Sequence, residues 1–508
     1  MAKRKRVLWL LATAAVVAAG ISLWSHRFGV AQDYTGMEEQ FKYGSIGSDH
    51  PLAEAPLPYW IWKVLPQIFP PSTVIAQGYG PRNNKTGYDA FGLVTEPQMD
   101  RPIGFSKRTV LGLDFVGLNC AFCHLTTLRK AAADPQTDLI LGGTGNSVDI
   151  EKYFLYLFAA LTNEHFNADE VMKAVLAQDK DMGWLERTVY RYAIIPYIKF
   201  KVAGLQKQFD FIDPINPKRL PKFGPGRVDT WAAYKRIFVN PPQRDSISGI
   251  VNFPPIWNQK ARIGMRLHWD GNTDVLEERN IVSALAVIGP RLDYLDLPRL
   301  TRVTDWIMGL VPPRYEDRVP STVVGGQTVP RIRHDLADQG RTLFQDRCGA
   351  CHDATGDRIG RVEPLADLGT DAGRLKAFTN ELTNSLNRLG TDAWTLRNFK
   401  PQSGYANMLI DGVWLRGPYL HNGSVPTLRD LLHDVDQRPK QFCRGSDLYD
   451  WKNVGFVVTI PTGTGDDRCG ELFLYDTTIP GNGNQGHLYG TELSEPDKEA
   501  LLEFLKTL

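Results

Sequence analysis

Two copies of one short motif constrain the fold of this 508-residue chain more than any other feature. In each copy, two cysteines are separated by two residues and followed at once by histidine. Two thiols one turn apart can form thioether bonds with both vinyl groups of one porphyrin, and the next residue then places an imidazole beneath the iron. We therefore expect two covalently bound c-type haems, attached through Cys120, Cys123 and His124 and through Cys348, Cys351 and His352.

Other interpretations of the two motifs are weaker. A zinc site would need a second Cys or His pair at a suitable spacing near each motif, and a thioredoxin-like redox pair would not need the histidine. The glycine-rich segment 142–146 lacks the Lys-Ser/Thr pair of a phosphate-binding loop and is more typical of a turn. With 58 Lys and Arg against 57 Asp and Glu, the chain shows no electrostatic footprint for nucleic acid.

The N-terminus has the pattern of an export segment. Four basic residues at 3–6 precede an uncharged run at 7–24, so we expect residues 1–31 to be a signal peptide or a membrane anchor. Cleavage after Ala31 and retention of residues 7–24 in the inner membrane are both open. Either outcome places the body in the periplasm or outside the cell, with no membrane contact beyond this segment.

The export pattern has a consequence for the other two cysteines, Cys443 and Cys469. Because an exported compartment is oxidising, these two residues can form a disulfide. Such a crosslink would stabilise the chain by about 3–4 kcal/mol in the chain-entropy model. Two free thiols are the alternative.

The domain organisation follows from composition and motif spacing. The 46 Gly and 33 Pro indicate that much of the chain is loop and turn. Together with the two motifs, they lead us to expect a mainly α fold with long irregular loops, little β structure and two cytochrome c-like haem domains in tandem. A Pro- and aromatic-rich arm at 32–114 would precede the first haem domain at 115–320, and a linker at 321–333 would lead into the second at 334–508. Helices are predicted at 148–162, after Asn167 as N-cap, at 335–348 and from Ser494 onward.

The opposite face of each iron needs its own ligand. For the second haem we favour His487, in a Gly/Asn-rich loop before the terminal helix, over His433 and Met408; a purely structural histidine is the alternative. An iron with two histidines has no free site, so it would move electrons and do no bond chemistry. For the first haem His165 and His268 are available. We expect an open or weakly occupied site there, where oxygen or peroxide would react.

Longer sequence strings give a family resemblance. The segments Trp269-Asp270-Gly271, Leu276-Glu277-Glu278 and 418–423 (PYLHNG) are similar to those of the bacterial di-haem cytochrome c peroxidase superfamily, which includes the methylamine dehydrogenase maturation enzyme. The fuller strings at 266–272 and 421–428 most resemble the rubber-oxygenase branch, di-haem cytochromes that cleave polyisoprene with oxygen. The resemblance covers residues 115–508.

The resemblance also implies roles for single residues. Trp269 would stand between the haems and relay electrons, with a packing role as the alternative, and His421 would lie beside the second haem and shape the wall between the domains. His487 fits the second axial position of this branch. A structural Ca²⁺ ion between the domains is a further candidate cofactor, and an electron-donor cytochrome or small redox protein is the expected partner.

The chain departs from the peroxidases in one respect. No histidine occurs between 166 and 267, and no acid occurs between 279 and 292, where those enzymes carry the groups that move protons of peroxide. We expect an exported di-haem oxidoreductase, cytochrome c peroxidase-like, that activates peroxide or O₂ at the N-terminal haem and transfers electrons through the C-terminal one. The alternatives are an oxygenase that cleaves a polyisoprene-like alkene and a pure electron-transfer cytochrome.

Overall fold

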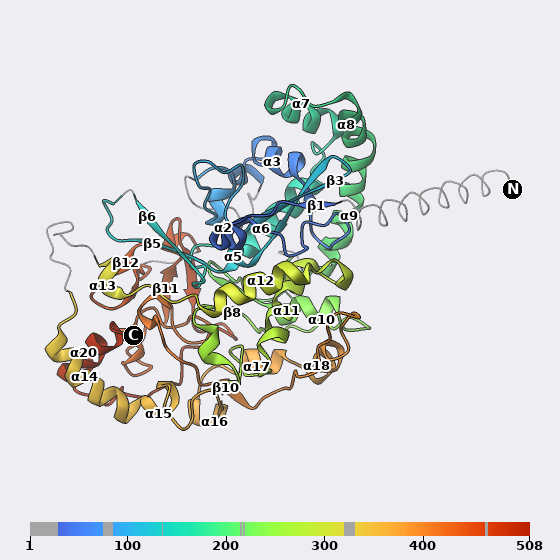
Figure 1. Cartoon of the computed structure of the whole chain (residues 1–508). Coiled ribbons are helices and arrows are strands. Elements are labelled where there is room, and N and C mark those ends of the chain that lie inside the picture. Colours follow the sequence, from blue (N-terminus) through green and yellow to red (C-terminus); the bar gives the residue numbers. More distant parts are fainter. Residues whose placement is uncertain are drawn as a thin grey trace.

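The computed structural model describes residues 29–74, 85–134, 136–213, 216, 219–319, 331–462 and 466–508. The charged and apolar parts of the predicted export segment and most of the predicted linker lie outside these residues. No helix in the described ranges combines the length and the hydropathy that crossing a bilayer requires. Segments from the first half of the chain form one end of the body, and those from the second half form the other (Figure 1).

The fold mixes helices with several small sheets, so the prediction of a mainly α fold with little β structure is wrong. Among the described residues, one sheet has four strands in the order β1-β3-β4-β2, and five sheets have two strands each. The three strand pairs of the larger sheet are antiparallel. The two-stranded sheets are antiparallel as well and pair β5 with β6, β7 with β8, β9 with β10, β11 with β14 and β12 with β13. The strands are β1 (Val30–Ala31), β2 (Leu57–Pro58), β3 (Phe105–Val110), β4 (Leu113–Leu118), β5 (Leu125–Arg129), β6 (Thr137–Leu141), β7 (Arg227–Val228), β8 (Val251–Asn252), β9 (Val362–Pro364), β10 (Gly404–Ala406), β11 (Gln441–Arg444), β12 (Tyr449–Asp450), β13 (Gly455–Phe456) and β14 (Phe473–Asp476).

The hairpin of β3 and β4 shows why the sequence hid these strands. Its register runs from Phe105 opposite Leu118 to Val110 opposite Leu113, so only two residues form the turn. Both have positive φ, 55° at Leu111 and 78° at Gly112, as a type I′ turn requires. Leucine rarely adopts that conformation. The turn therefore lacks the Asn-Gly or Asp-Gly pair by which such hairpins are recognised.

The helices follow the sequence patterns more closely. Those predicted at 148–162, after Asn167, at 335–348 and after Ser494 are confirmed as α6, α7, α14 and α20, and the side chains of Asn167 and Ser494 cap theirs. The helices of the first half are α2 (Met37–Tyr43), α3 (Tyr59–Ile68), α4 (Pro71–Val74), α5 (Cys120–Cys123), α6 (Ile150–Thr162), α7 (Ala168–Gln178), α8 (Trp184–Val189), the π-helix η2 (Tyr190–Ile194), α9 (Ile195–Gln208) and α10 (Thr230–Ile237). The later ones are α11 (Leu276–Ile288), α12 (Leu297–Met308), α13 (Tyr315–Arg318), α14 (His334–Arg347), α15 (Gly349–His352), α16 (Leu365–Leu368), α17 (Gly373–Ala377), α18 (Asn380–Leu386), α19 (Leu428–Leu431) and α20 (Glu495–Leu505). Short 3₁₀ turns are η1 (Gly87–Phe91), η3 (Gln259–Arg262), η4 (Leu292–Tyr294), η5 (Val413–Leu415) and η6 (Asp466–Cys469).

The segment predicted as an N-terminal arm packs closely against the first motif. Phe105 on β3 meets the ring of Phe122, which lies between the two cysteines, with centroids 5.6 Å apart. Trp62 on α3 stacks on Tyr88 at 4.5 Å. The boundary expected after residue 31 coincides with the end of β1, and the one expected after residue 114 falls within β4. The domain limits stay predictions, but this segment supplies part of the wall that supports the first motif.

The two halves also share a hydrophobic core, so two independent tandem domains are not what the structure shows. Leu128 and Trp257 from the first half pack in one cluster with Trp414 and Trp451 from the second. The indole N–H of Trp451 donates to the carbonyl of Lys130 at 2.9 Å. Pairings over more than 300 residues of sequence therefore join the two motif-bearing regions.

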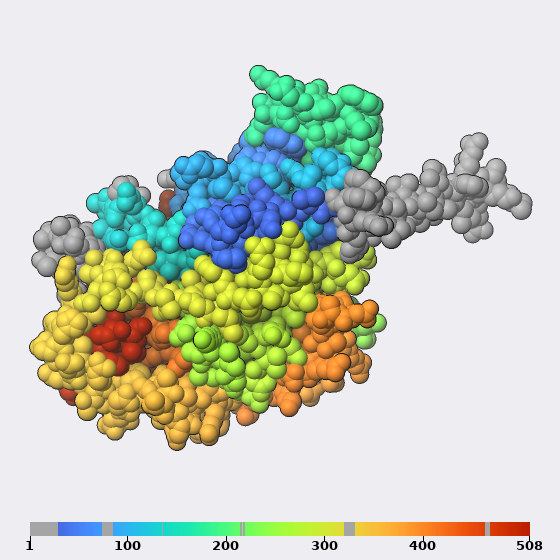
Figure 2. Space-filling model, viewed as in Figure 1, coloured from blue at the N-terminus to red at the C-terminus, as the bar shows by residue number. Residues whose placement is uncertain are grey.

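Helices α14 and α20 cross in close contact beside the second motif. A Cβ added at Gly340 would lie 2.0 Å from the carbonyl oxygen of Ala500, so only glycine permits this approach. Phe344 and Phe504 fill the same interface with ring centroids 5.0 Å apart. In the space-filling view the red C-terminal segment is bordered on the left and above by segments coloured yellow (Figure 2).

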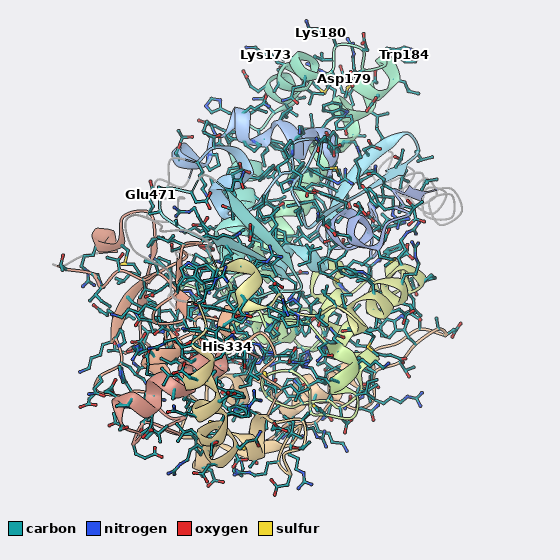
Figure 3. The ribbon with its side chains drawn as sticks, turned by 60° about the vertical axis from the view of Figure 1, so that its left-hand side comes forward. Lys173, Asp179, Lys180, Trp184, His334 and Glu471 are labelled. Carbon is teal, nitrogen blue, oxygen red and sulfur yellow. A yellow bond between two sulfur atoms is a disulfide. The ribbon has the colours of Figure 1, made fainter. Side chains whose placement is uncertain are left out.

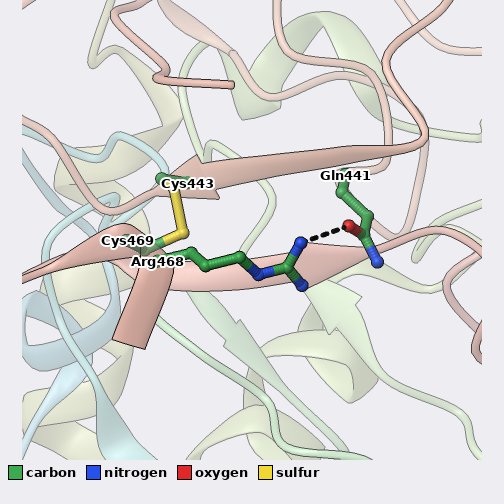
Figure 4. The surroundings of a disulfide bond; sticks show 4 residues. All are labelled: Gln441, Cys443, Arg468 and Cys469. Atoms are coloured by element: carbon green, nitrogen blue, oxygen red, sulfur yellow. Dashed lines mark hydrogen bonds between the residues drawn. A yellow bond between two sulfur atoms is a disulfide. The ribbon is translucent and has the colours of Figure 1, made fainter. Parts of the chain in front are cut away.

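A disulfide and a projecting pair of helices complete the fold. The predicted disulfide between Cys443 and Cys469 is present and joins β11 to η6, where Arg468 also donates to the side-chain oxygen of Gln441 at 3.1 Å (Figure 4). At the opposite end, α7 and α8 project from the body, with Trp184 77% exposed at the tip (Figure 3). Neither helix lines the two cavities described below.

Candidate functional site

The first motif is held in place by a capped helical turn. The side-chain oxygen of Asn119 accepts a hydrogen bond from the Ala121 amide at 3.0 Å and caps α5, while its amide donates to the carbonyls of Lys42 and Gly44. His124 follows α5, and its Nδ1 lies 3.3 Å from the carbonyl oxygen of Gly143. A histidine that donates through Nδ1 keeps Nε2 free for a metal.

The second motif repeats this arrangement with different elements. Cys348 lies at the junction of α14 and α15, and His352 ends α15. The Nδ1 of His352 lies 2.8 Å from the carbonyl oxygen of Met408. Burial lowers the pKa of His352 and lowers that of His124 to about 4, so both rings are neutral, as iron ligation requires.

The four motif cysteines form no disulfide. Burial raises the pKa of Cys120 and of Cys348 to about 11 and raises that of the other two as well. Burial thus disfavours the charged thiolate, whereas a thioether carries no charge. No group of three or more His, Cys, Asp or Glu side chains among the described residues could hold a metal ion. The donor set therefore fits covalent haem attachment, and it gives no support to a zinc or calcium site.

A cavity lies against the first motif. Cys120, Cys123 and His124 form part of its wall. Most of the remaining wall is apolar, with the aromatic rings of Phe154, Phe209, Phe211, Phe223 and Phe253.

A second cavity lies against the other motif. Its wall contains Cys348, Cys351 and His352, and the loop residue His487. The imidazole rings of His352 and His487 have centroids 6.2 Å apart. Two metal–nitrogen bonds of about 2 Å each plus the ring radii give roughly the same separation. The geometry thus fits one iron between these two rings.

The competing ligands for the second haem lie in less suitable places. Met408 lines the cavity, but its carbonyl holds the ring of His352, which puts this segment on the proximal side. His433 does not line the cavity and lies 3.9 Å from a carboxylate oxygen of Glu495. His487 has φ 50°, and its Nδ1 is buried without a hydrogen-bond partner. The assignment of His487 stays a prediction that this geometry supports.

The two histidines considered for the first haem differ in whether they line the first cavity. The side chain of His165 is 71% exposed and lies away from the cavity. His268 lines the cavity, and its Nδ1 is 2.8 Å from the side-chain oxygen of Asn272. The amide of Asn272 donates in turn to Asp270 at 3.1 Å, so its oxygen must face His268. Nδ1 of His268 is therefore the donor, which leaves Nε2 as an acceptor.

Trp269 occupies the position that its proposed relay role needs. Among the described residues it alone lines both cavities. Its indole N–H donates to the carbonyl of Asn252 at 2.9 Å, and its own carbonyl accepts from the Ala406 amide at 2.9 Å. Asn252 also accepts, through its side chain, from Arg444 at 3.2 Å. The indole is thus fixed between the two cavities by backbone from both halves of the chain.

His421 lies in the wall of the second cavity, as predicted for a residue beside that haem. Its ring stacks on Tyr405 at 4.2 Å, and its Nε2 is 3.1 Å from the Tyr405 hydroxyl. Burial, assisted by the charge of Arg374, lowers the pKa of His421 to about 3. The neutral ring packs against Tyr405 and forms a hydrogen bond with it. The predicted role of His421 beside the second haem stays a prediction.

Sequence reasoning missed several residues that shape the two cavities. The carbonyls of Gly143 and Met408 orient the proximal rings, although any residue type supplies a carbonyl. Asn252 anchors Trp269, and Arg279 places a charge in the first cavity. The 142–146 segment carries a visible glycine signal, but the other positions have no local pattern that could have revealed them.

Comparisons with known proteins agree with a haem-binding assignment. Residues 404–443 match a family model described as RoxA-like, cytochrome c-like, and this segment contributes Met408 and His421 to the second cavity. The match implies haem c and suggests a haem-dependent oxidoreductase.

Two proteins of Sinorhizobium fredii are similar to the chain. The uncharacterized protein y4iM is 31% identical over 275 residues, which cover 48% of this chain and 59% of that protein. The uncharacterized protein y4iJ is 25% identical over an alignment of 644 positions that spans 100% of both chains. The alignment with y4iM thus covers less than two thirds of that relative, and neither name states an activity.

Proposed function

We propose that the protein is an exported di-haem c-type oxidoreductase of the rubber-oxygenase kind. The observation that carries the proposal is that Trp269 lines two cavities, each with a Cys-x-x-Cys-His motif in its wall. A relay between two redox centres needs such an intermediate position. We place the body in the periplasm or outside the cell, on the pattern of residues 1–31.

The first cavity is the proposed site of reaction with O₂ or peroxide. A haem bound there would supply the redox chemistry of its iron. His124 would hold the iron from one side, and the aromatic wall would exclude water and accept an apolar substrate. The carboxylates of Glu151 and Asp229 in this wall are already engaged by Arg219 and by backbone amides, so they are poorly placed to move protons of peroxide. The apolar wall favours an oxygenase that cleaves an apolar alkene, whereas a peroxidase would have to rely on Nε2 of His268 as the proton acceptor.

The second cavity is the proposed electron-transfer site. His352 and His487 would occupy both axial positions, which leaves no site for a substrate. Trp269 would connect this centre with the first, and an electron-donor cytochrome or small redox protein would supply the electrons. The residues of the second cavity thus hold and orient a carrier and take no part in bond cleavage.

A pure electron-transfer cytochrome is the second candidate, and one observation favours it. The free Nε2 of His268 belongs to the first cavity, so this ring could close the sixth position of the first iron. Both centres would then be six-coordinate and unable to bind O₂. The two candidates differ in whether one iron binds external ligands.

The experiment is a haem count followed by ligand binding. The pyridine haemochrome of the purified protein should show two haems per chain, and one after replacement of Cys120 and Cys123 by alanine. Carbon monoxide added to the reduced protein should perturb one haem of the intact chain and none in that variant. No perturbation of the intact protein would leave the electron carrier as the function.

The substrate is tested separately on the intact protein. Under O₂, polyisoprene should be cut into oligomers with carbonyl ends, which reagents for aldehydes and ketones detect by mass spectrometry. Turnover of hydrogen peroxide with a reduced cytochrome, and no cleavage of the polymer, would establish the peroxidase alternative instead.

A further inference from the structure

Four charged side chains line the first cavity, and three of them have partners within the protein. These are Glu151, Asp229, Arg279 and Arg374. Glu151 accepts from Arg219 at 2.7 Å and from the Phe223 amide at 2.5 Å. Asp229 accepts from the amides of Ala232 and Gly249 at 2.9 and 2.6 Å. Their charges are therefore balanced without any ligand.

Arg374 is balanced as well. Its Nε lies 3.6 Å from a carboxylate oxygen of Asp270, and its guanidinium stacks 4.0 Å from the centre of the Trp231 ring. One of its terminal nitrogens lies 3.4 Å from the carbonyl of Gly249. Arg374 thus belongs to the network that orients His268 through Asp270 and Asn272.

Arg279 is the exception. It lies on the face of α11 that borders the cavity, beside Val282 and Val287. Its side chain makes no hydrogen bond or ion pair with any described residue, and its Nε is enclosed without a partner. Burial lowers its pKa to about 10, so the guanidinium still carries its charge at neutral pH. A porphyrin in this cavity would displace the water that could otherwise hydrate this cation.

The position of Arg279 argues against the porphyrin's own carboxylates as its partner. Burial is the main cause of the pKa shifts of Cys120, His124 and His268, and the charge of Arg279 acts on all three groups. Arg279 also lines the same cavity as the motif cysteine Cys120, which would bind a vinyl group. Vinyl and carboxylate groups occupy opposite edges of a haem, so a group beside Cys120 lies far from the carboxylates.

We propose that Arg279 makes the first cavity a receptor for small anions, the conjugate bases of weak acids such as hydrogen fluoride, hydrogen cyanide or a hydroperoxide. Its guanidinium donates hydrogen bonds to the anion, and the apolar wall strengthens this attraction by excluding water. This inference rests on the proposed function, because the cavity must hold a haem with an open position. It names the class of ligand that this position binds.

Fluoride is a suitable probe because it is a strong hydrogen-bond acceptor and its binding to ferric haem changes the visible spectrum. Fluoride is titrated into the oxidised holoprotein, its R279Q and R279K variants and the control S283A, which changes the same helix face without removing a charge. R279Q should raise the dissociation constant about 10- to 100-fold, the range expected when a charge-assisted hydrogen bond is lost. R279K should lie between R279Q and the wild type, and S283A should stay within about 2-fold.

Other outcomes would overturn the inference in distinguishable ways. Equal fluoride affinity of wild type and R279Q, at equal haem content, would show that Arg279 does not bind the anion. A lower haem content of R279Q with unchanged affinity in the remaining holoprotein would assign the guanidinium to a porphyrin carboxylate. If R279Q cannot be loaded with haem, the R279K variant decides: a fluoride affinity equal to that of the wild type would contradict the proposal. If fluoride does not change the visible spectrum of the wild type, the first haem has no open position and the proposed function is wrong.

Discussion

The imidazole rings of His352 and His487 face each other across the second cavity with centroids 6.2 Å apart, although 135 residues separate them in the sequence. His352 belongs to α15 and is oriented by the carbonyl of Met408. His487 belongs to a loop, and the backbone amide of His487 donates to the carbonyl of Leu368 at 2.8 Å. This separation is the one that a single iron would need, so it yields the most direct prediction.

Replacing His487 by alanine should open the second haem to external ligands. The low-spin signal of about half of the haem should become high-spin, because one axial nitrogen is lost and water is a weaker ligand. Visible and electron paramagnetic resonance spectra measure the change, and added imidazole should restore the original spectrum. His433→Ala is the matched control and should leave the spectrum unchanged, and an unchanged spectrum of the His487 variant would mean that another residue is the ligand.

Replacing Trp269 by phenylalanine should slow electron transfer between the haems. Among the described residues the indole is the one side chain shared by the two cavities. Because phenylalanine is much harder to oxidise, we expect a rate lower by about 10-fold or more. Stopped-flow mixing of the half-reduced protein with a ligand of the first haem measures this rate. Trp231→Phe serves as control because Trp231 lines the first cavity but not the second. Equal rates in both variants would contradict the relay role.

Replacing Gly340 by alanine should destabilise the second haem region. The new Cβ would lie 2.0 Å from the carbonyl oxygen of Ala500, so α14 and α20 would have to separate, at a cost of about 1–3 kcal/mol. Gly204→Ala in α9 is the control, since no atom lies within 4 Å of its added Cβ, and it should stabilise by about 0.5–1 kcal/mol. Thermal unfolding followed in the haem absorption band compares the two variants. A stability loss for Gly204→Ala as large as for Gly340→Ala would contradict this explanation.

The buried ring of His421 should make stability depend on acid pH. Because its pKa is about 3 in the folded protein and near 6.5 when unfolded, the unfolded chain binds a proton first as the pH falls. The free energy of unfolding should therefore decrease as the pH falls below about 6.5, and His421 should contribute up to about 1.4 kcal/mol per pH unit to this decrease. Above that pH, the protonation of His421 should not affect stability. Denaturant unfolding of wild type and His421→Gln between pH 7 and 4 measures the effect. Parallel curves for the two proteins would show that His421 is not responsible.

The sequence by itself determined the features that depend on neighbouring residues. The Cys-x-x-Cys-His spacing places two thiols and an imidazole on one helical turn, whatever surrounds them. The caps at Asn167 and Ser494 are equally local, since each side chain accepts from an amide two or three residues ahead. The pair Cys443 and Cys469 could be inferred because the other four cysteines already had a role.

Tertiary structure alone decided what faces each motif from a distance. The position of Trp269 between the cavities depends on Asn252, and the core that joins the halves depends on contacts such as that between Trp451 and Lys130. The sheets were missed because their strands are short, and the β3–β4 turn uses Leu111 where a recognisable signal would be Asn or Asp. Local patterns carry no information about such pairings, since long-range packing selects one of many partners that are equally apolar or polar. The isolation of the Arg279 charge, too, became visible only once the partners of every other charge in its cavity were known.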